Sequence, residues 1–350
     1  GEGGRRGWAQ VSRYEEALEA VSASASIGAP VDAEDPAVIL YTSGTTGKPK
    51  GCMLAHRSWV ANNLNMASEF GITRNDIYGA VLPFFHVAGL GTLFTHLHRG
   101  GCVVPIPKWS AELMAQEIEN RRITTTFLVP PMLQQLITLD QIGWGKPSTL
   151  RLVIGGAGFE PPSVVEAVEK KLGAAFYGIY GQTEAGNIVT SASAEEILKQ
   201  PATYGRELMG FSVRIVDEDD REVPAGEPGE LVVRGPSVMI GYWNREEETR
   251  ETLRNGWLHT GDVFVRHEDG SLEMVDRKKY LIKTGGENVY PAEVEKVLSA
   301  HPCIAEVAVV GVPDRDWGES IKAFVVLAKG KQVTREELRD WCYERIARYK

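Results

Sequence analysis

Short apolar runs alternate with helical patterns through much of the chain. The runs have the length and composition of buried strands and lie at residues 37–41, 125–129, 152–154 and 174–176. Proline pairs at 130–131 and 161–162 follow two of them, at positions where a helix can begin. The pattern predicts an α/β fold in which a large domain of mixed sheets is flanked by helices.

The later part of the chain changes character twice. Residues 205–275 are rich in turns and contain strand patterns at 213–216 and 231–233, which predicts a β-rich subdomain. Beyond it, a helix from Pro291, strands at 307–310 and 323–326, and a capped helix at Thr334 predict a small α+β unit.

One helical pattern lies at 56–70. Its apolar residues Val60, Leu64, Ala67 and Phe70 recur at helical spacing and predict the buried face. With the run at 37–41 and the polar stretch between them, this helix predicts a strand–loop–helix unit.

Composition excludes several classes of protein. The net charge of −9 and dispersed basic residues argue against a nucleic-acid surface, and the four cysteines have no paired spacing for a zinc site or a disulfide framework. The most apolar window, 78–98, is interrupted by Pro83 and two histidines, so no integral membrane segment is predicted. The N-terminus has no signal-peptide pattern, and a cytoplasmic location is expected.

The stretch 41–51 reads Tyr-Thr-Ser-Gly-Thr-Thr-Gly-Lys-Pro-Lys-Gly and is rich in anion-binding groups. Hydroxyl donors, backbone N–H groups brought close by glycine, and lysine charge together suit a polyphosphate. It is not a Walker loop, because Lys48 is followed by Pro49 and the glycines are too close. A polar surface turn is the alternative. The candidate ligands are Thr42, Ser43, Gly44, Thr45, Thr46, Gly47 and Lys48.

Four further places carry candidate chemistry, and each also has an ordinary structural interpretation. His86 lies in an apolar segment and could be a core histidine. Gly156 and Ala157 belong to a glycine-rich turn, and Asp262 ends a Thr-Gly-Asp turn. Glu184, in a segment of aromatic, hydroxyl and carboxylate groups, could be a surface acid.

Three segments, in order along the chain, favour the functional interpretation of these candidates. The loop at 41–51 closely resembles the phosphate-binding signature of the adenylate-forming enzymes, and Tyr180-Gly181-Gln182-Thr183-Glu184 resembles their Tyr-Gly-x-Thr-Glu motif. The stretch 276–295 resembles the start of their C-terminal lid. The chain is thus similar to the acyl-CoA synthetases of this superfamily from about Asp35 onward.

This resemblance implies a role for each candidate. The loop would hold ATP phosphates, Tyr180 would pack on adenine beside Gly156 and Ala157, and Thr183 would contact phosphate. The remaining implied roles are a Mg²⁺ ligand, a ribose-binding pair and a residue near the acid carboxylate, carried by Glu184, by Asp262 with Arg277, and by His86.

The resemblance also implies two domains, a large AMP-binding domain over 1–278 and a mobile lid over 279–350. Lys279 would be the hinge, and Gly285 and Gly286 would guide the pantetheine arm of coenzyme A. Relatives have a longer N-terminal segment and a further lid segment with a catalytic lysine. The chain is therefore expected to be part of a longer protein, and Lys350 is not taken as that lysine.

The predicted function is ATP-dependent activation of a carboxylic acid through an acyl-adenylate to an acyl-CoA thioester, with ATP, Mg²⁺ and coenzyme A as cofactors. The segment 84–88 contains no acid to pair with an amine, so an aliphatic or aromatic acid is expected rather than an amino acid. A luciferase-like enzyme, a carrier-protein-loading enzyme and a noncatalytic nucleotide-binding module stay open, as does a homodimer.

Overall fold

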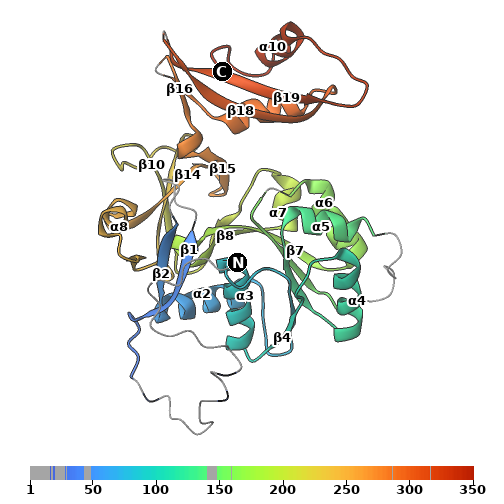
Figure 1. The fold of residues 1–350 in the computed structure, drawn as a ribbon, viewed down its shortest axis with the longest axis vertical. Coiled ribbons are helices and arrows are strands. Elements are labelled where there is room, and N and C mark those ends of the chain that lie inside the picture. Colours follow the sequence, from blue (N-terminus) through green and yellow to red (C-terminus); the bar gives the residue numbers. More distant parts are fainter. Residues whose placement is uncertain are drawn as a thin grey trace.

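The computed structural model describes Glu16, Glu19 and residues 28, 30–42, 49–139, 148–158, 160–285, 287–315 and 317–350. Four sheets and their helices make up this part of the chain, and the C-terminal sheet lies at one end of the molecule (Figure 1). Within these residues no helix combines the length and the apolar content needed to cross a membrane.

A seven-stranded sheet forms the centre of the larger part. Its order is β4-β3-β5-β6-β7-β8-β9; the pairs from β4 to β7 are parallel, and the last two are antiparallel. The strands are β3 (Ile77–Ala80), β4 (Cys102–Pro105), β5 (Thr125–Leu128), β6 (Leu152–Gly155), β7 (Ala175–Gln182), β8 (Asn187–Ser193) and β9 (Arg206–Glu207).

Both faces of this sheet are covered. In β6, Leu152 and Ile154 belong to one buried cluster and Val153 to another, as alternation along a strand requires. The first cluster includes residues of α2 (His56–Glu69), beside which lies α3 (Val87–His98). The second includes residues of α4 (Ala111–Arg121), α5 (Pro130–Ile137), α6 (Pro162–Ala167), the π-helical turn Val168–Leu172 and α7 (Ala194–Lys199).

Two smaller sheets complete this part. One is β1-β2-β12, and the other joins β10, β11, β14 and β13 in order, with β15 paired to β14. Their bounds are β1 (Pro36–Thr42), β2 (Lys50–Ala55), β10 (Ser212–Val216), β11 (Pro228–Arg234), β12 (Gly241–Tyr242), β13 (Leu253–Arg254), β14 (Trp257–Arg266) and β15 (Leu272–Arg277), with α8 (Glu246–Thr252) between β12 and β13. The β-rich pattern at 205–275 agrees with this arrangement.

The C-terminal unit begins after the 3₁₀ turn η3 (Lys278–Tyr280). Its sheet has the order β17-β16-β19-β18 and one layer of helices. The elements are β16 (Ile282–Thr284), β17 (Glu287–Val289), α9 (Pro291–Ser299), β18 (Ile304–Asp314), β19 (Gly318–Leu327) and α10 (Arg335–Tyr343). Thr334 and Glu337 form the predicted capping box of α10. The boundary at 278/279 stays a prediction.

Two local predictions were wrong. The expected strand–loop–helix unit contains an extra strand, because β2 pairs antiparallel with β1 before α2 begins. Of the predicted face of α2, Ala67 and Phe70 are buried as expected, but Val60 and Leu64 are each 47% exposed, whereas Asn62 and Asn63 are buried. The Oγ1 atom of Thr95 in α3 donates to Asn63 Oδ1 at 3.1 Å, so polar contact between the two helices sets the buried face.

Candidate functional site

Tyr180 and Asp262 form the centre of the candidate site. Tyr180 lies near the end of β7, and its hydroxyl donates to Asp262 Oδ2 on β14 at 2.7 Å, although 82 residues separate them in the chain. Both residues are buried. The Tyr180 ring meets Phe264 edge to face, with centroids 4.8 Å apart, which holds the ring in place.

Asp262 sits in a turn built to present its carboxylate. Its N–H donates to Thr260 Oγ1 at 3.1 Å, and Gly261 takes φ +72°, a conformation that favours glycine. Across the strand pair, Arg277 Nε lies 3.4 Å from Asp262 Oδ1. The predicted aspartate–arginine pair is therefore in contact.

Burial dominates the electrostatics of this pair. Desolvation raises the pKa of Asp262, against the opposing effects of the Tyr180 hydrogen bond and the Arg277 charge. The charge of Glu184 also raises this pKa, which places the two carboxylates within electrostatic reach of each other. Desolvation and the nearby Asp262 charge likewise raise the pKa of Tyr180, so its hydroxyl stays a hydrogen-bond donor.

Glu184 is held by hydroxyl groups from distant strands. Tyr242 donates to Glu184 Oε1 at 2.8 Å, and Thr42 donates to the same oxygen at 3.3 Å. Burial and the Glu184 charge raise the pKa of Tyr242 and keep this donor protonated. The ammonium of Lys50 lies 5.1 Å from the centroid of the Tyr242 ring, at the same edge of the site.

The Glu184 carboxylate suits a hard cation. Its described partners are neutral hydroxyls, and the residues the structure describes include no ion pair to it. Within those residues there is also no cluster of three or more metal-ligating side chains. A single carboxylate that shares Mg²⁺ with substrate phosphates and water meets both observations.

The phosphate loop itself cannot be described, because Ser43–Lys48, and with them the candidates Gly44, Thr45, Thr46 and Gly47, lie outside the described residues. Its two flanks are informative. Thr42 and Lys50 face each other as the last pair of the β1–β2 ladder, so the loop starts and ends at one point. That point adjoins Glu184 through the Thr42 hydrogen bond.

The glycine-rich turn packs against the strand that carries Tyr180. A Cβ on Gly156 would lie 2.7 Å from Ile179 Cδ1, so only glycine lets the turn approach β7 this closely. Ala157 follows in the left-handed region, with φ 63°, and is exposed. Thr183 adjoins Glu184 in the 3₁₀ turn η2 (Thr183–Ala185), where its carbonyl accepts from Gly186 N–H at 3.0 Å.

His86 has a structural contact. Its Nδ1 atom accepts the N–H of Ala88 at 3.3 Å and caps α3, and the side chain is exposed rather than enclosed in the core. None of its described contacts reaches Tyr180, Glu184 or Asp262.

The lid candidates lie apart from this cluster. Lys279 is exposed, with its ammonium 4.7 Å from the Tyr280 ring centroid. Gly285 donates its N–H to the carbonyl of Trp317 at 2.9 Å, and Gly286 lies outside the described residues. Their roles with coenzyme A stay predictions.

Two partners of the site were missed from the sequence. Gln182 Nε2 donates to the Tyr180 hydroxyl at 3.3 Å, and Tyr242 holds Glu184. Gln182 lies inside the recognised motif and could have been noted. Tyr242 lies 58 residues from Glu184 and next to a charged segment, and no local signal in the sequence marks it as a partner of Glu184.

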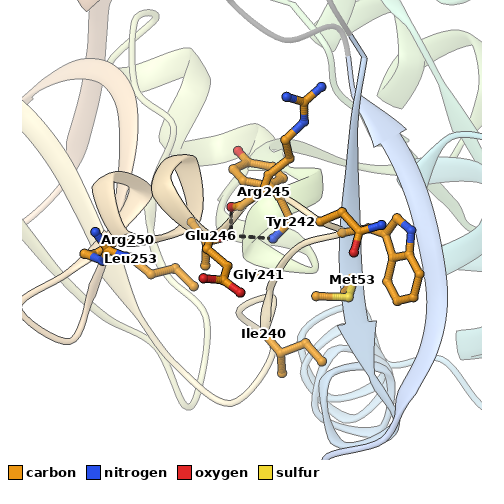
Figure 2. A pocket seen from close by; sticks show the side chains of 11 residues that line it. Met53, Ile240, Gly241, Tyr242, Arg245, Glu246, Arg250 and Leu253 are labelled. Carbon is orange, nitrogen blue, oxygen red and sulfur yellow. Dashed lines mark hydrogen bonds between the residues drawn. The ribbon is translucent and has the colours of Figure 1, made fainter.

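A cavity of about 410 Å³ is lined in part by Tyr242 and Glu246 (Figure 2). It is bounded by β12, α8 and Met53 of β2, and Thr249 Oγ1 accepts the Tyr242 N–H there at 2.9 Å. Its lining includes neither Glu184 nor Asp262, but it shares Tyr242 with the candidate site.

Known proteins match the chain along most of its length. The AMP-binding enzyme model matches residues 6–243, and the AMP-binding enzyme C-terminal domain model matches residues 293–350. A 2-succinylbenzoate–CoA ligase of Bacillus thuringiensis subsp. konkukian is 39% identical over 97% of this chain and 70% of its own length. One from Bacillus cereus strain Q1 is 40% identical over 91% of this chain and 65% of its own length.

Solved structures agree. O-succinylbenzoate coenzyme A synthetase from Bacillus subtilis, in complex with AMP, superposes with a TM-score of 0.84 at 34% identity, covering 96% of this chain and 68% of that one. ATP-bound MatB from Rhodopseudomonas palustris gives 0.81 at 33% identity, covering 91% and 63%. These matches confirm the predicted α/β fold and family. The chain belongs to the AMP-binding enzyme family, among the acyl-CoA synthetases of the adenylate-forming superfamily.

Proposed function

We propose that this protein activates an aryl carboxylic acid of the 2-succinylbenzoate type with ATP and transfers the acyl group to coenzyme A. The relatives named above are 2-succinylbenzoate–CoA ligases, and a solved relative binds ATP with magnesium. The predicted ligase class and its cofactors ATP, Mg²⁺ and coenzyme A are thereby confirmed for the family. Of the two predicted acid classes, the relatives favour the aromatic one.

The observation that carries the proposal is the buried Tyr180–Asp262 pair, with the exposed Arg277 in contact with Asp262, within electrostatic reach of Glu184. A carboxylate with free lone pairs can accept both hydroxyls of a ribose, and Arg277 keeps it charged. Tyr180 would pack on adenine beside the Gly156 turn, which approaches Ile179 of the same strand. A nucleotide placed this way directs its phosphates toward Glu184 and the β1–β2 loop.

The chain's residues would then supply binding and orientation. Glu184 would share Mg²⁺ with the phosphates, and Thr183 with Ser43–Lys48 would donate to phosphate oxygens. When bound, Mg²⁺ would neutralise part of the negative charge on the phosphates. His86, which marks the start of α3, would lie near the acid carboxylate as it attacks the α-phosphate and releases pyrophosphate.

The second step would use the C-terminal unit. Coenzyme A thiol attacks the acyl carbon, a thioester forms and AMP leaves, so atoms balance over the two steps. We propose that Lys279 is the hinge between domains at 1–278 and 279–350, and that Gly285 and Gly286 line the path of the pantetheine arm. We keep as predictions that the protein is cytoplasmic and that it has no nucleic-acid partner. The homodimer also stays a prediction.

A product assay tests the proposal. The protein is incubated with ATP, Mg²⁺ and coenzyme A together with 2-succinylbenzoate, benzoate or octanoate, and the acyl-CoA is identified by mass. We expect thioester and AMP with 2-succinylbenzoate in the largest amount, and little with Asp262→Ala. AMP release that does not depend on coenzyme A would favour a luciferase-like or carrier-loading enzyme. AMP binding without pyrophosphate exchange for any acid would favour a nucleotide-binding module.

A further inference from the structure

Glu230 is a buried carboxylate with an unusual set of partners. It lies on β11, and only 7% of its surface is exposed. Its Oε1 atom accepts the backbone N–H of Gly261 at 3.0 Å, and its Oε2 atom accepts from Lys278 Nζ at 3.0 Å and contacts His259 Nδ1 at 3.3 Å. The two carboxylate oxygens therefore contact different segments of the chain: Oε1 contacts Gly261, and Oε2 contacts Lys278 and His259.

Through Gly261 and Lys278, Glu230 contacts two separate segments of the chain. Gly261 precedes Asp262 in the turn assigned to ribose. Lys278 is the first residue of η3, the only chain connection between the five-stranded sheet and the C-terminal sheet. One buried side chain thus joins the ribose turn to the link between the two sheets.

The charge on Glu230 is stable in this setting. Burial alone would raise its pKa, but hydrogen bonds from His259 and Lys278 outweigh burial and hold the pKa at about 2. A carboxylate in this state only accepts, so His259 Nδ1 must carry the proton in the contact. Asp220 stands 3.8 Å from His259 Nε2, and Arg254 lies 4.0 Å from Glu230 Oε2.

We propose that Glu230 is a positioning residue that couples nucleotide binding to the order of the Lys278–Tyr280 linker. By fixing Gly261 it holds Asp262 for the ribose, and by pairing with Lys278 it transmits the occupancy of that turn to the linker. Coupling of this kind is reciprocal, so a nucleotide that orders the turn also orders the linker. The inference rests on the proposed nucleotide site.

Two variants separate the roles of the two oxygens. Glu230→Gln keeps the size of the side chain but has one acceptor oxygen and one NH₂ group, so it cannot accept from both Gly261 and Lys278. Lys278→Met removes only the linker contact, and because Lys278 is 41% exposed the variant should fold. The matched control is Lys283→Met, since Lys283 pairs instead with exposed Glu218, at 3.1 Å.

The readouts are AMP affinity by calorimetry and hydrogen exchange of the amides at 277–284 with and without AMP. In the unmodified protein and Lys283→Met, AMP should slow linker exchange several-fold. We expect Glu230→Gln to bind AMP about 5- to 50-fold more weakly, because a charge-assisted hydrogen bond to the turn is weakened. Lys278→Met should bind AMP within about twofold of the unmodified protein and lose the AMP-dependent protection.

Retained protection in Lys278→Met would overturn the proposal, as would equal loss in Lys283→Met, which would point to general loosening of the segment. If the unmodified protein does not bind AMP at all, the proposed nucleotide site fails instead. If AMP binds and the linker shows no protection in any form of the protein, the site stands and the coupling is refuted.

Discussion

Replacing Tyr180 with phenylalanine tests the central hydrogen bond of the site in isolation. The ring contact with Phe264, at 4.8 Å between centroids, survives the change, so no cavity forms. What is lost is a 2.7 Å hydrogen bond to a buried carboxylate. Hydrogen bonds to charged groups contribute about 1.5–3 kcal/mol, so a loss of about 2 kcal/mol in the free energy of unfolding is expected near neutral pH.

The loss should depend on pH, with a sign that follows from Asp262. Desolvation already raises the folded pKa of Asp262 above 3.8, and the Tyr180 hydrogen bond opposes this rise. Without the hydroxyl the folded pKa rises further, and the folded variant binds a proton more readily. The destabilisation is therefore full above the raised pKa, where the carboxylate is charged, and shrinks as pH falls toward the ordinary value.

The assay is urea unfolding followed by tryptophan fluorescence at about pH 8 and close to the ordinary pKa of an aspartate, at about pH 4. Tyr204→Phe is the matched control: its ring also meets Phe264, with centroids 6.1 Å apart, and no hydrogen bond of its hydroxyl is found among the described residues. We expect the control to cost less than about 0.5 kcal/mol. A loss of this small size in Tyr180→Phe, or the same loss at both pH values, would refute the reasoning.

Four further predictions follow from the same contacts. Glu184→Gln should weaken binding of ATP with Mg²⁺ about tenfold and leave AMP binding nearly unchanged, because the metal is lost with the charge; calorimetry with and without Mg²⁺ decides. Asp262→Ala should weaken AMP and ATP by a similar factor, since the ribose is common to both, and a loss confined to ATP in the same titrations would contradict a ribose role. Gly285→Ala should lower thermal stability by about 1–3 kcal/mol, because φ is +58° and the new Cβ would lie 2.6 Å from Trp317 Cε3. Glu230, with its pKa lowered from 4.5 to about 2, should contribute on the order of 3 kcal/mol above pH 4.5 that is lost as pH falls toward 2, so acid unfolding of Glu230→Gln should depend less on pH.

The sequence correctly predicted the elements that depend on residues close together in the chain. The proline pair at 130–131 starts α5, the capping box at Thr334 starts α10, and the apolar run at 152–154 forms β6. The Asp262–Arg277 contact was expected from the family resemblance alone, and the structure places it within one antiparallel pair of strands. In each case the informative residues lie close in sequence or in a recognised motif.

Tertiary contacts decided the rest. The predicted face of α2 was wrong at Val60 and Leu64, because Asn63 finds a hydroxyl partner on α3, a contact that hydrophobic periodicity cannot predict. The strand β2 was missed because its first residues, Lys50 and Gly51, were assigned to the polar loop 41–51, and only pairing with β1 makes 50–55 a strand. Tyr242 was missed because its partner is 58 residues away, and Glu230 because its hydrogen-bond partners are 29, 31 and 48 residues away.

The carboxylates of Asp262 and Glu230 are buried and that of Glu184 is partly buried, and the three differ in how well their charges are compensated. Asp262 carries a raised pKa because desolvation and the charges of the other two carboxylates exceed the help from Tyr180 and Arg277. Glu230, by contrast, is fully supplied with donors, and its pKa is lowered. Asp262, whose charge is less well compensated, is the residue proposed to contact the ligand. Glu230, whose charge is well compensated, accepts the N–H of the neighbouring Gly261. Ribose hydroxyls and a cation would supply what Asp262 and Glu184 lack, so ligand binding relieves a cost that folding alone leaves in place.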